Sequence, residues 1–344
     1  MSIKGVHLMK KKLIAAAVAV VLVFVIVANF IFSRTVNEVF MAMNTTVSLN
    51  IECYKPDKTA QKIKDEITRL DVELLSRTNT SSEIYAVNNG KVQVSDELAD
   101  LLRELKQIEI DSGGAFCVGL GALSDLWGIG TDKARVPTQA EIDATIKNAH
   151  EWSIDGNTVY LPVGVRLDMG AVGKGYACDS ITDILSDTNR ARVVAAVGGS
   201  VLAYSSKAKD KFTIGIRDPL EQTLSTCATI ETTSACVSTS GNYERFFEDK
   251  NGNRYHHIFD PSTGYPADSG LISVTVITNS GCVSDALSTA CFVLGIKKSL
   301  PLLEKYGAEA VFITNNNEII TTLSDGDSAK LTVTNNNYKL GELE

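Results

Sequence analysis

The sequence predicts an α/β protein, more closely an α+β domain on a mixed sheet, because helical and strand patterns both recur along the chain. Apolar side chains in residues 58–75 recur at the spacing of an amphipathic helix. Residues 43–51 instead alternate apolar and polar side chains, as a half-buried strand does. Because no repeat or low-complexity linker divides residues 41–344, we expect them to fold as one domain.

Local signals place three further elements in the first half of the chain. Ser95 is a favourable N-cap for a helix that should end at the glycine pair at residues 113–114. Thr138 and Glu141 form a capping-box pattern, which predicts another helix. An Asp-Gly-Asn sequence between apolar residues predicts a β-hairpin at residues 154–159.

The second half of the chain is predicted to be richer in strands. Helices are expected to start near Ser284 and near Ser299. The strand-like runs are residues 193–197, 212–217, 228–236, 271–277, 311–314, 319–322 and 330–334.

The composition indicates a globular protein with excess negative charge. Of its 344 residues, 44% are hydrophobic and 22% are charged, and the net charge is -8. Nucleic-acid binding needs clustered Lys and Arg, and no basic stripe follows residue 40, so we exclude a nucleic-acid partner. The seven cysteines form no Cys-x-x-Cys pair and lie in apolar runs, which favours buried, reduced thiols over disulfides.

The N-terminus has the pattern of a membrane anchor. Lysines at positions 10–12 precede an uncharged run at residues 13–32, and a helix of that length spans roughly 30 Å, enough to cross a bilayer. The lysines place residues 1–12 in the cytoplasm. We therefore expect a single-pass protein of the cell membrane, with a linker at residues 33–40 and residues 41–344 outside the cytoplasm. A cleaved signal peptide and a buried core helix are the alternatives.

A glycine-rich segment at residues 167–179 is a candidate ligand-binding turn. Its glycines lie between a predicted strand at residues 165–168 and a helix that starts near Val172. Asp168 and Lys174 add an acceptor and a cation to the same space. A helix N-terminus presents unpaired N–H groups that suit phosphate. An ordinary glycine-rich connection is the alternative interpretation.

Polar residues near the start of a later helix fit a hard cation. Asp285 and Thr289 lie one helical turn apart, so their oxygens share a face. A carboxylate and a hydroxyl suit Mg²⁺, although an Asp near a helix N-terminus also suits the helix dipole alone. The adjacent His256 and His257 have no Cys or Glu at ligand spacing, so we expect no transition-metal site there.

Taken in order, these motifs and their neighbours resemble the FAD:protein FMN transferases, the ApbE-type flavin transferases. The matching segments are residues 43–47, 112–116, 126–128, 167–176, 198–199, 215–219, 238–241, 257–264 and 285–290. The resemblance implies a single ApbE-like, T-fold-related catalytic domain that depends on Mg²⁺. It implies that the enzyme uses FAD as substrate, transfers FMN to a Thr or Ser hydroxyl of an extracytoplasmic target protein through a phosphodiester bond, and releases AMP.

The resemblance also assigns roles to individual positions. It implies that FAD is bound by Met43, Thr78, Ala115, Phe116, Cys117, Asp168, Lys174 and Ile258. It implies that the metal ion is held by Ala171, through its backbone carbonyl, and by Asp285 and Thr289. His257 would be the base that accepts the proton of the incoming hydroxyl.

Departures from the family pattern leave these metal ligands in place. Asn44 stands where glycine is usual, Thr78 where an aromatic residue is usual, and Cys117 and Ser200 where Asp is usual. Two other functions would use the same residues. One is a FAD pyrophosphatase that yields FMN and AMP with water as the nucleophile, and the other is a membrane-tethered flavin-binding protein without turnover.

Overall fold

The computed structural model describes residues 34–188, 190–221, 225–324 and 329–343, together with three single positions at 18, 21 and 22. Apart from those three positions, the predicted anchor at residues 13–32 lies outside the described residues. Among the residues that are described, no helix has the length and apolar character needed to cross a membrane.

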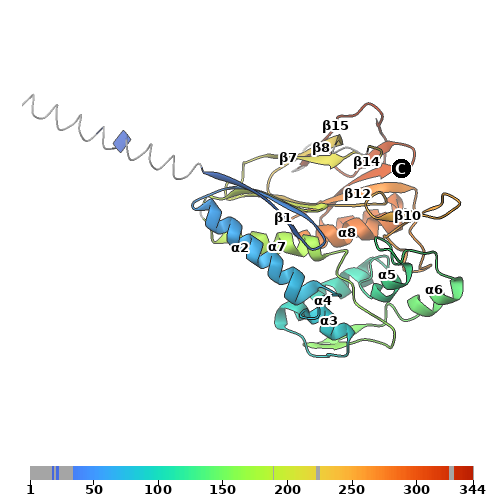
Figure 1. Cartoon of the computed structure of the whole chain (residues 1–344). Coiled ribbons are helices and arrows are strands. Elements are labelled where there is room, and N and C mark those ends of the chain that lie inside the picture. Colours follow the sequence, from blue (N-terminus) through green and yellow to red (C-terminus); the bar gives the residue numbers. More distant parts are fainter. Residues whose placement is uncertain are drawn as a thin grey trace, which may run out of the picture.

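A nine-stranded sheet forms the centre of the described part of the chain, in the order β1-β2-β5-β6-β9-β12-β13-β14-β16 (Figure 1). Its strands are β1 (Thr35–Ala42), β2 (Thr45–Glu52), β5 (Arg192–Val197), β6 (Ser200–Ser205), β9 (Ala235–Gly241), β12 (Leu271–Thr278), β13 (Glu309–Thr314), β14 (Glu318–Thr321) and β16 (Lys339–Leu340). Strand β14 pairs in parallel with β16, whereas the other neighbouring pairs are antiparallel. The predicted mixed sheet is therefore confirmed.

A smaller sheet covers one face of the large one. It joins β15 (Ala329–Val333), β8 (Thr226–Thr232) and β7 (Phe212–Arg217), and lies above the large sheet in Figure 1. Apolar side chains of both sheets, among them Phe212, Ile230 and Ile313, form a core between them. Two hairpins complete the strands described, β3 (Ser153–Asp155) with β4 (Thr158–Tyr160) and β10 (Phe246–Glu248) with β11 (Arg254–His256).

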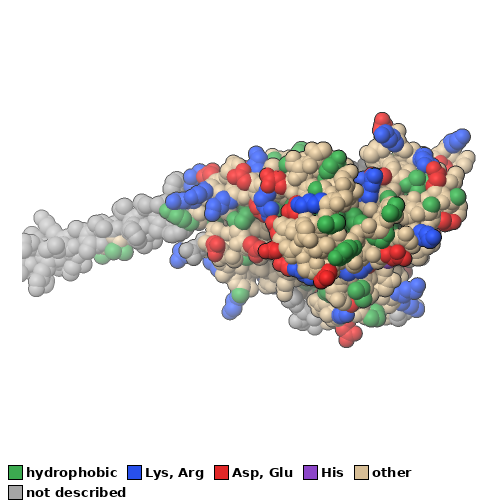
Figure 2. Space-filling model, turned by 90° about the horizontal axis from the view of Figure 1, so that it is seen from below, with side chains coloured by type: hydrophobic (Ala, Val, Ile, Leu, Met, Phe, Trp, Pro, Cys, Tyr) green, Lys and Arg blue, Asp and Glu red, His purple; other side chains and the backbone are tan. Residues whose placement is uncertain are grey.

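Helices cover the opposite face and build the main core (Figure 1). Those of the main core are α2 (Pro56–Arg69), which continues as the π-helical η1 (Leu70–Leu75), α3 (Glu83–Asn88), α4 (Asp96–Asp111), α7 (Gly173–Ser186), α8 (Gly281–Leu294) and α9 (Ile296–Tyr306). The helices α5 (Gly121–Trp127) and α6 (Gln139–Ile146) pack together in a separate small cluster. On the face seen in Figure 2, acidic and basic side chains are interspersed.

Several local predictions are confirmed. The predicted helix at residues 58–75 is α2 with η1, and Ser95 caps α4 by accepting a hydrogen bond from the backbone N–H of Leu98 at 3.3 Å. Thr138 and Glu141 form the expected capping box of α6. The seven cysteines all lie in the described part of the chain, where each is buried and none forms a disulfide.

The linker predicted at residues 33–40 is wrong, because residues 35–42 form β1 and pair with β2 along their whole length. The strand β1 lies at the edge of the sheet, and none of its eight residues is fully buried. An edge strand needs no strong apolar pattern, which is why the sequence of this segment resembled a connector.

Two strand predictions also need correction. Residues 165–168 form no strand, and only Arg166 makes an isolated bridge. The side chain of Asn88 instead forms both hydrogen bonds of the Leu167 backbone, donating to its carbonyl at 2.9 Å and accepting from its N–H at 2.7 Å. The run at residues 228–236 is two strands, β8 and β9, which belong to different sheets.

Helices α7 and α8 cross in direct backbone contact near their N-termini. A Cβ atom added at Gly175 would lie 2.0 Å from the carbonyl oxygen of Gly281, so only glycine fits there. Asp179 of α7 accepts hydrogen bonds from the first backbone N–H groups of α8, at 2.6 Å from Gly281 and 2.7 Å from Cys282. The two helix starts are thus held in one fixed arrangement.

We predict that Gly175→Ala lowers the free energy of unfolding by about 3 kcal/mol, because two packed helices must separate to admit a methyl group. Gly156→Ala is the control: a Cβ atom there meets open space, so only its positive φ should cost about 1 kcal/mol. Urea denaturation of both variants measures the difference. Equal stability of the two variants would contradict a tight crossing.

Candidate functional site

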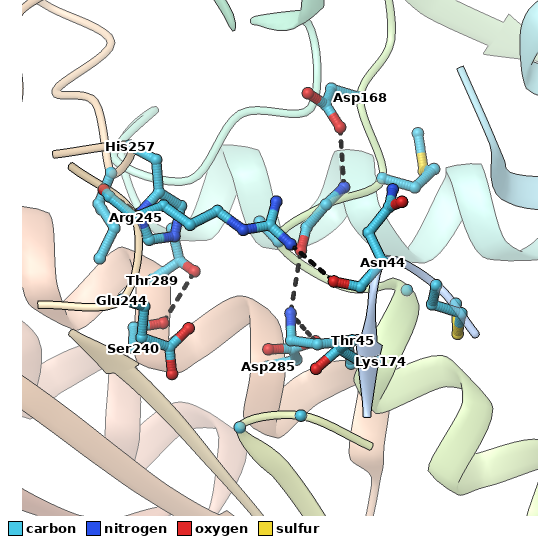
Figure 3. A pocket seen from close by; sticks show the side chains of 18 of the residues that line it. Asn44, Thr45, Asp168, Lys174, Ser240, Glu244, Arg245, His257, Asp285 and Thr289 are labelled. Carbon is cyan, nitrogen blue, oxygen red and sulfur yellow. Dashed lines mark hydrogen bonds and ion pairs between the residues drawn. The ribbon is translucent and has the colours of Figure 1, made fainter. Parts of the chain in front are cut away.

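A cleft of about 1440 Å³ opens beside the α7–α8 crossing. All twelve residues predicted for the site line it, namely Met43, Thr78, Ala115, Phe116, Cys117, Asp168, Ala171, Lys174, His257, Ile258, Asp285 and Thr289. Five of them, Asp168, Lys174, His257, Asp285 and Thr289, are labelled in Figure 3, where they come from separate parts of the chain and surround a common space. The structure therefore brings the predicted residues together, while the roles assigned to them remain predictions.

The turn between β1 and β2 forms one rim of the cleft. Met43 and Asn44 both have positive φ, 51° and 55°, as the central residues of a tight hairpin turn do. Asn tolerates this left-handed conformation better than most residues, which explains how Asn44 replaces a glycine here. The backbone N–H of Met43 donates to Asp71 at 2.7 Å, and its side chain lies over Gly173, where an added Cβ would be 3.2 Å from it.

Asp168 is held rigidly at the glycine-rich turn. One of its carboxylate oxygens accepts the backbone N–H of Gly170 at 2.9 Å. The other lies 3.1 Å from the guanidinium of Arg77, which also pairs with Asp125. Arg77 is not among the residues predicted for the site, although it directly precedes Thr78, which is.

Lys174 and Asp285 form the charged centre of the cleft. The ammonium of Lys174 lies 3.4 Å from Oδ2 of Asp285 and donates to the carbonyl of Gly170 at 3.0 Å. The same Oδ2 accepts the backbone N–H of Gly175 at 2.9 Å. No described residue forms a hydrogen bond with Oδ1 of Asp285, so this oxygen of the carboxylate can meet a ligand.

Hydroxyl groups extend this polar surface along α8. Thr289, one turn after Asp285, lies with its Oγ1 3.2 Å from Oγ of Ser240, and Ser240 also contacts Ser288 at 2.8 Å. Asp285, Thr289 and Ala171 all line the cleft and carry a carboxylate, a hydroxyl and a backbone carbonyl. These are oxygen donors of the kind that Mg²⁺ prefers.

His257 stands on the other side of the cleft from the glycine-rich turn (Figure 3). Its Nδ1 lies 3.2 Å from the carbonyl oxygen of Arg245. A carbonyl can only accept, so Nδ1 carries the proton and Nε2 carries the lone pair. Burial, together with the positive charge of Arg245, lowers the pKa of His257 to about 4, so the imidazole is neutral at pH 7.

Two further charged residues, Glu244 and Arg245, line the cleft and were missed by the sequence analysis. The guanidinium of Arg245 donates to the carbonyl of Asn44 at 3.3 Å, which joins the β1–β2 turn to the opposite rim. Burial raises the pKa of Glu244. The available signal was their position, shortly after the hydroxyl-bearing residues 238–240 of the segment that matches the family.

The apolar part of the cleft is formed by Phe116 and Ile258, both buried. Thr78 is exposed, and its hydroxyl lies 3.3 Å from that of Ser76. An aromatic platform is therefore absent at this position, and flavin stacking would have to rely on other residues of the cleft.

Comparison with known proteins gives one consistent result. The model of the ApbE family matches residues 43–312. A FAD:protein FMN transferase of Treponema pallidum is 34% identical over 264 residues, which are 70% of this chain and 73% of that protein. One from Klebsiella pneumoniae is 32% identical over 281 residues, 78% of this chain and 87% of that protein.

Solved structures agree with the sequence comparison. The crystal structure of the ApbE protein from Thermotoga maritima has a TM-score of 0.77 at 31% identity and covers 85% of this chain and 97% of its own. The flavinyl transferase ApbE of Pseudomonas stutzeri has a TM-score of 0.69 at 26% identity and covers 87% of this chain and 94% of its own. With a family match over most of its length and relatives above 30% identity, this chain belongs to the ApbE family.

Proposed function

We propose that this protein is a FAD:protein FMN transferase, an enzyme that moves the FMN half of FAD onto a Thr or Ser hydroxyl of a target protein through a phosphodiester bond and releases AMP. The observation that carries the proposal is the meeting of His257, Lys174 and Asp285 in one cleft of a chain that belongs to the ApbE family. Attack of a hydroxyl on a diphosphate needs a positioned nucleophile, a proton acceptor and positive charge at the phosphates.

A Mg²⁺ ion fits the oxygen donors of the cleft. Asp285, Thr289 and the carbonyl of Ala171 would hold it, with Oδ1 of Asp285 as the carboxylate oxygen that no described residue occupies. When bound, the ion would withdraw charge from the diphosphate. The set of one carboxylate, one hydroxyl and one carbonyl, with room for waters in the cleft, favours this hard cation over softer metals.

Lys174 is the residue placed to meet the negative charge of the substrate. It lies in the first turn of α7, and the positive end of the helix dipole favours an anion there. Its contact with Gly170 is to a neutral carbonyl, so a phosphate oxygen would replace that contact at a gain in electrostatic energy. Lys174 would then bind and orient the diphosphate.

His257 is the candidate proton acceptor for the incoming hydroxyl. Arg245 fixes the tautomer in which Nε2 is free to accept a proton. The bound diphosphate would offset the positive charge of Arg245 and so raise the pKa of His257 toward neutrality. His257 would thereby accept the proton most readily when FAD is in place.

The location of the target protein follows from the N-terminal pattern. The lysines at positions 10–12 and the apolar run at residues 13–32 support a single-pass anchor in the cell membrane. The domain, FAD and the target protein would then meet outside the cytoplasm.

Replacing the proposed metal ligand should stop the reaction without unfolding the protein. Asp285→Asn keeps an oxygen that can accept the Gly175 N–H but removes the charge that a divalent ion needs. We expect FMN transfer, measured by mass spectrometry of the target, and AMP release to fall at least about 100-fold, with FAD still bound. The control Asp155→Asn, in the β3–β4 hairpin, should retain full activity.

The two enzymatic alternatives separate in the same experiment. Transfer predicts AMP release that depends on the target protein, whereas a FAD pyrophosphatase releases AMP without it. Undiminished transfer in Asp285→Asn would overturn the role of Asp285. Absence of both AMP release and target labelling in the unaltered protein would leave only flavin binding.

His257 should titrate far below an ordinary histidine. We expect an NMR pH titration to give a pKa of about 4, and Arg245→Gln to raise it by removing one opposing charge. Between pH 6.5 and about pH 4, His257 is protonated in the unfolded protein but neutral in the folded protein. The free energy of unfolding therefore falls as the pH is lowered through this range. A native His257 pKa near 6.5 would contradict the assigned environment.

Membrane attachment can be tested by fractionation. The full chain should remain with the membrane fraction after an alkaline carbonate wash. Such a wash disrupts electrostatic contacts at the membrane surface but does not extract a helix that spans the bilayer. A variant that lacks residues 13–32 should be recovered in the supernatant. Release of the full chain by the wash would contradict the anchor.

A further inference from the structure

A second group of metal-ligating side chains reaches the wall of the cleft at Cys117, apart from the oxygens of α8. Glu109, Cys117 and His150 place a carboxylate oxygen, a sulfur and a ring nitrogen within 4.8 Å of one another. These three residues come from the end of α4, the segment that follows it, and the segment after α6. The function proposed above uses none of them to hold an ion.

The fold brings the three residues together through one glycine turn. After α4, Gly114 adopts a φ of 85° and its N–H donates to the carbonyl of Glu109 at 2.9 Å. The chain thereby turns back, and Cys117 lies with its sulfur 3.4 Å from the carbonyl of Ala149. A Cβ atom on Gly114 would lie 3.2 Å from the ring of His150, so glycine makes room for the imidazole.

Glu109 is prepared to act as an anionic ligand. It is 3% exposed, and it accepts hydrogen bonds from Trp152 at 2.8 Å, Lys106 at 2.9 Å and His150 at 3.2 Å. Burial alone would raise its pKa, but these three donors outweigh burial and lower it. The carboxylate is therefore charged and fixed in direction.

We propose that Glu109, Cys117 and His150 bind a zinc ion, with a water molecule as the fourth ligand. In a tetrahedral zinc site, nitrogen and oxygen ligands lie about 3.3 Å apart and sulfur lies about 3.6 Å from either. The contact between His150 and Glu109 already has the first spacing, at 3.2 Å. Binding forms the Zn–S, Zn–N and Zn–O bonds and replaces the hydrogen bond between His150 and Glu109. The proton of the Cys117 thiol passes to solvent, and the ring proton of His150 moves from Nδ1 to Nε2 by exchange with solvent.

Ligand chemistry separates this site from the proposed magnesium site. A thiolate and an imidazole select zinc or cobalt, whereas Asp285, Thr289 and a carbonyl offer oxygen alone. His150 is partly exposed and provides a route for the ion from solvent.

The ion would stiffen one wall of the cleft. Cys117 itself borders the cleft, and it directly follows Ala115 and Phe116, which also line it. Zinc would tie this segment to α4 and to the segment that carries His150. The proposal does not depend on FMN transfer, because it concerns metal binding and stability alone.

Metal titration of the full chain, freed of metal by a chelator, tests the proposal. We expect one zinc ion per chain to bind and to raise the thermal unfolding midpoint. With Co²⁺ as the probe, we expect an absorption band from thiolate-to-cobalt charge transfer. Excess Mg²⁺ should displace neither ion.

Variants assign the signal to these residues. Cys117→Ser and His150→Gln should each weaken zinc binding at least about tenfold, and Cys117→Ser should remove the cobalt band. Cys53→Ser, which alters another buried thiol, should leave both unchanged. Absence of the band in the unaltered chain, or a band that survives in a folded Cys117→Ser variant, would overturn the proposal. The test on the unaltered chain needs no variant, so its result holds even if a variant fails to fold.

Discussion

The site depends on the contact between Gly175 and Gly281, where the backbones of α7 and α8 touch. With no side chain between them, Asp285 of α8 can accept the N–H of Gly175 at 2.9 Å, and Lys174 of α7 lies 3.4 Å from the same carboxylate. Asp179 closes the arrangement by capping α8 from α7. The charged centre is therefore positioned by packed helices rather than by a loop, which gives the precision that catalysis needs.

Acidic and basic residues of the cleft are held in different ways. Asp168 and Asp285 accept backbone N–H groups of the glycine-rich turn and of α7, so each carboxylate is fixed to the main chain. The cations sit at the ends of long side chains: Lys174 donates to the carbonyl of Gly170 in addition to its ion pair with Asp285, and Arg245 donates to the carbonyl of Asn44. A phosphate is a stronger acceptor than a carbonyl, so the cations can exchange partners while the carboxylates stay in place.

Signals confined to a few neighbouring residues were sufficient to predict the capped helices and the pairing of Asp285 with Thr289 on one face. The errors arose where distant segments decide the structure. Residues 165–168 have the pattern of a strand, but Asn88, far away in sequence, takes both hydrogen-bonding groups of Leu167. Arg245 reaches Asn44 across 201 positions, and no local pattern encodes such a contact. The roles of individual site residues came from the family resemblance. Composition and spacing alone were equally compatible with an ordinary glycine-rich connection and with an Asp that only complements a helix dipole.

The low pKa of His257 has a consequence for the proposed reaction. In the free protein, burial and Arg245 make Nε2 a weak base, so a water molecule that enters the cleft meets little basic assistance. A bound diphosphate brings negative charge to the same space and strengthens that base. Proton acceptance is then coupled to the presence of FAD. Because this coupling acts equally on water and on a protein hydroxyl, preference for the target must come from its position in the cleft, by orientation rather than by base strength.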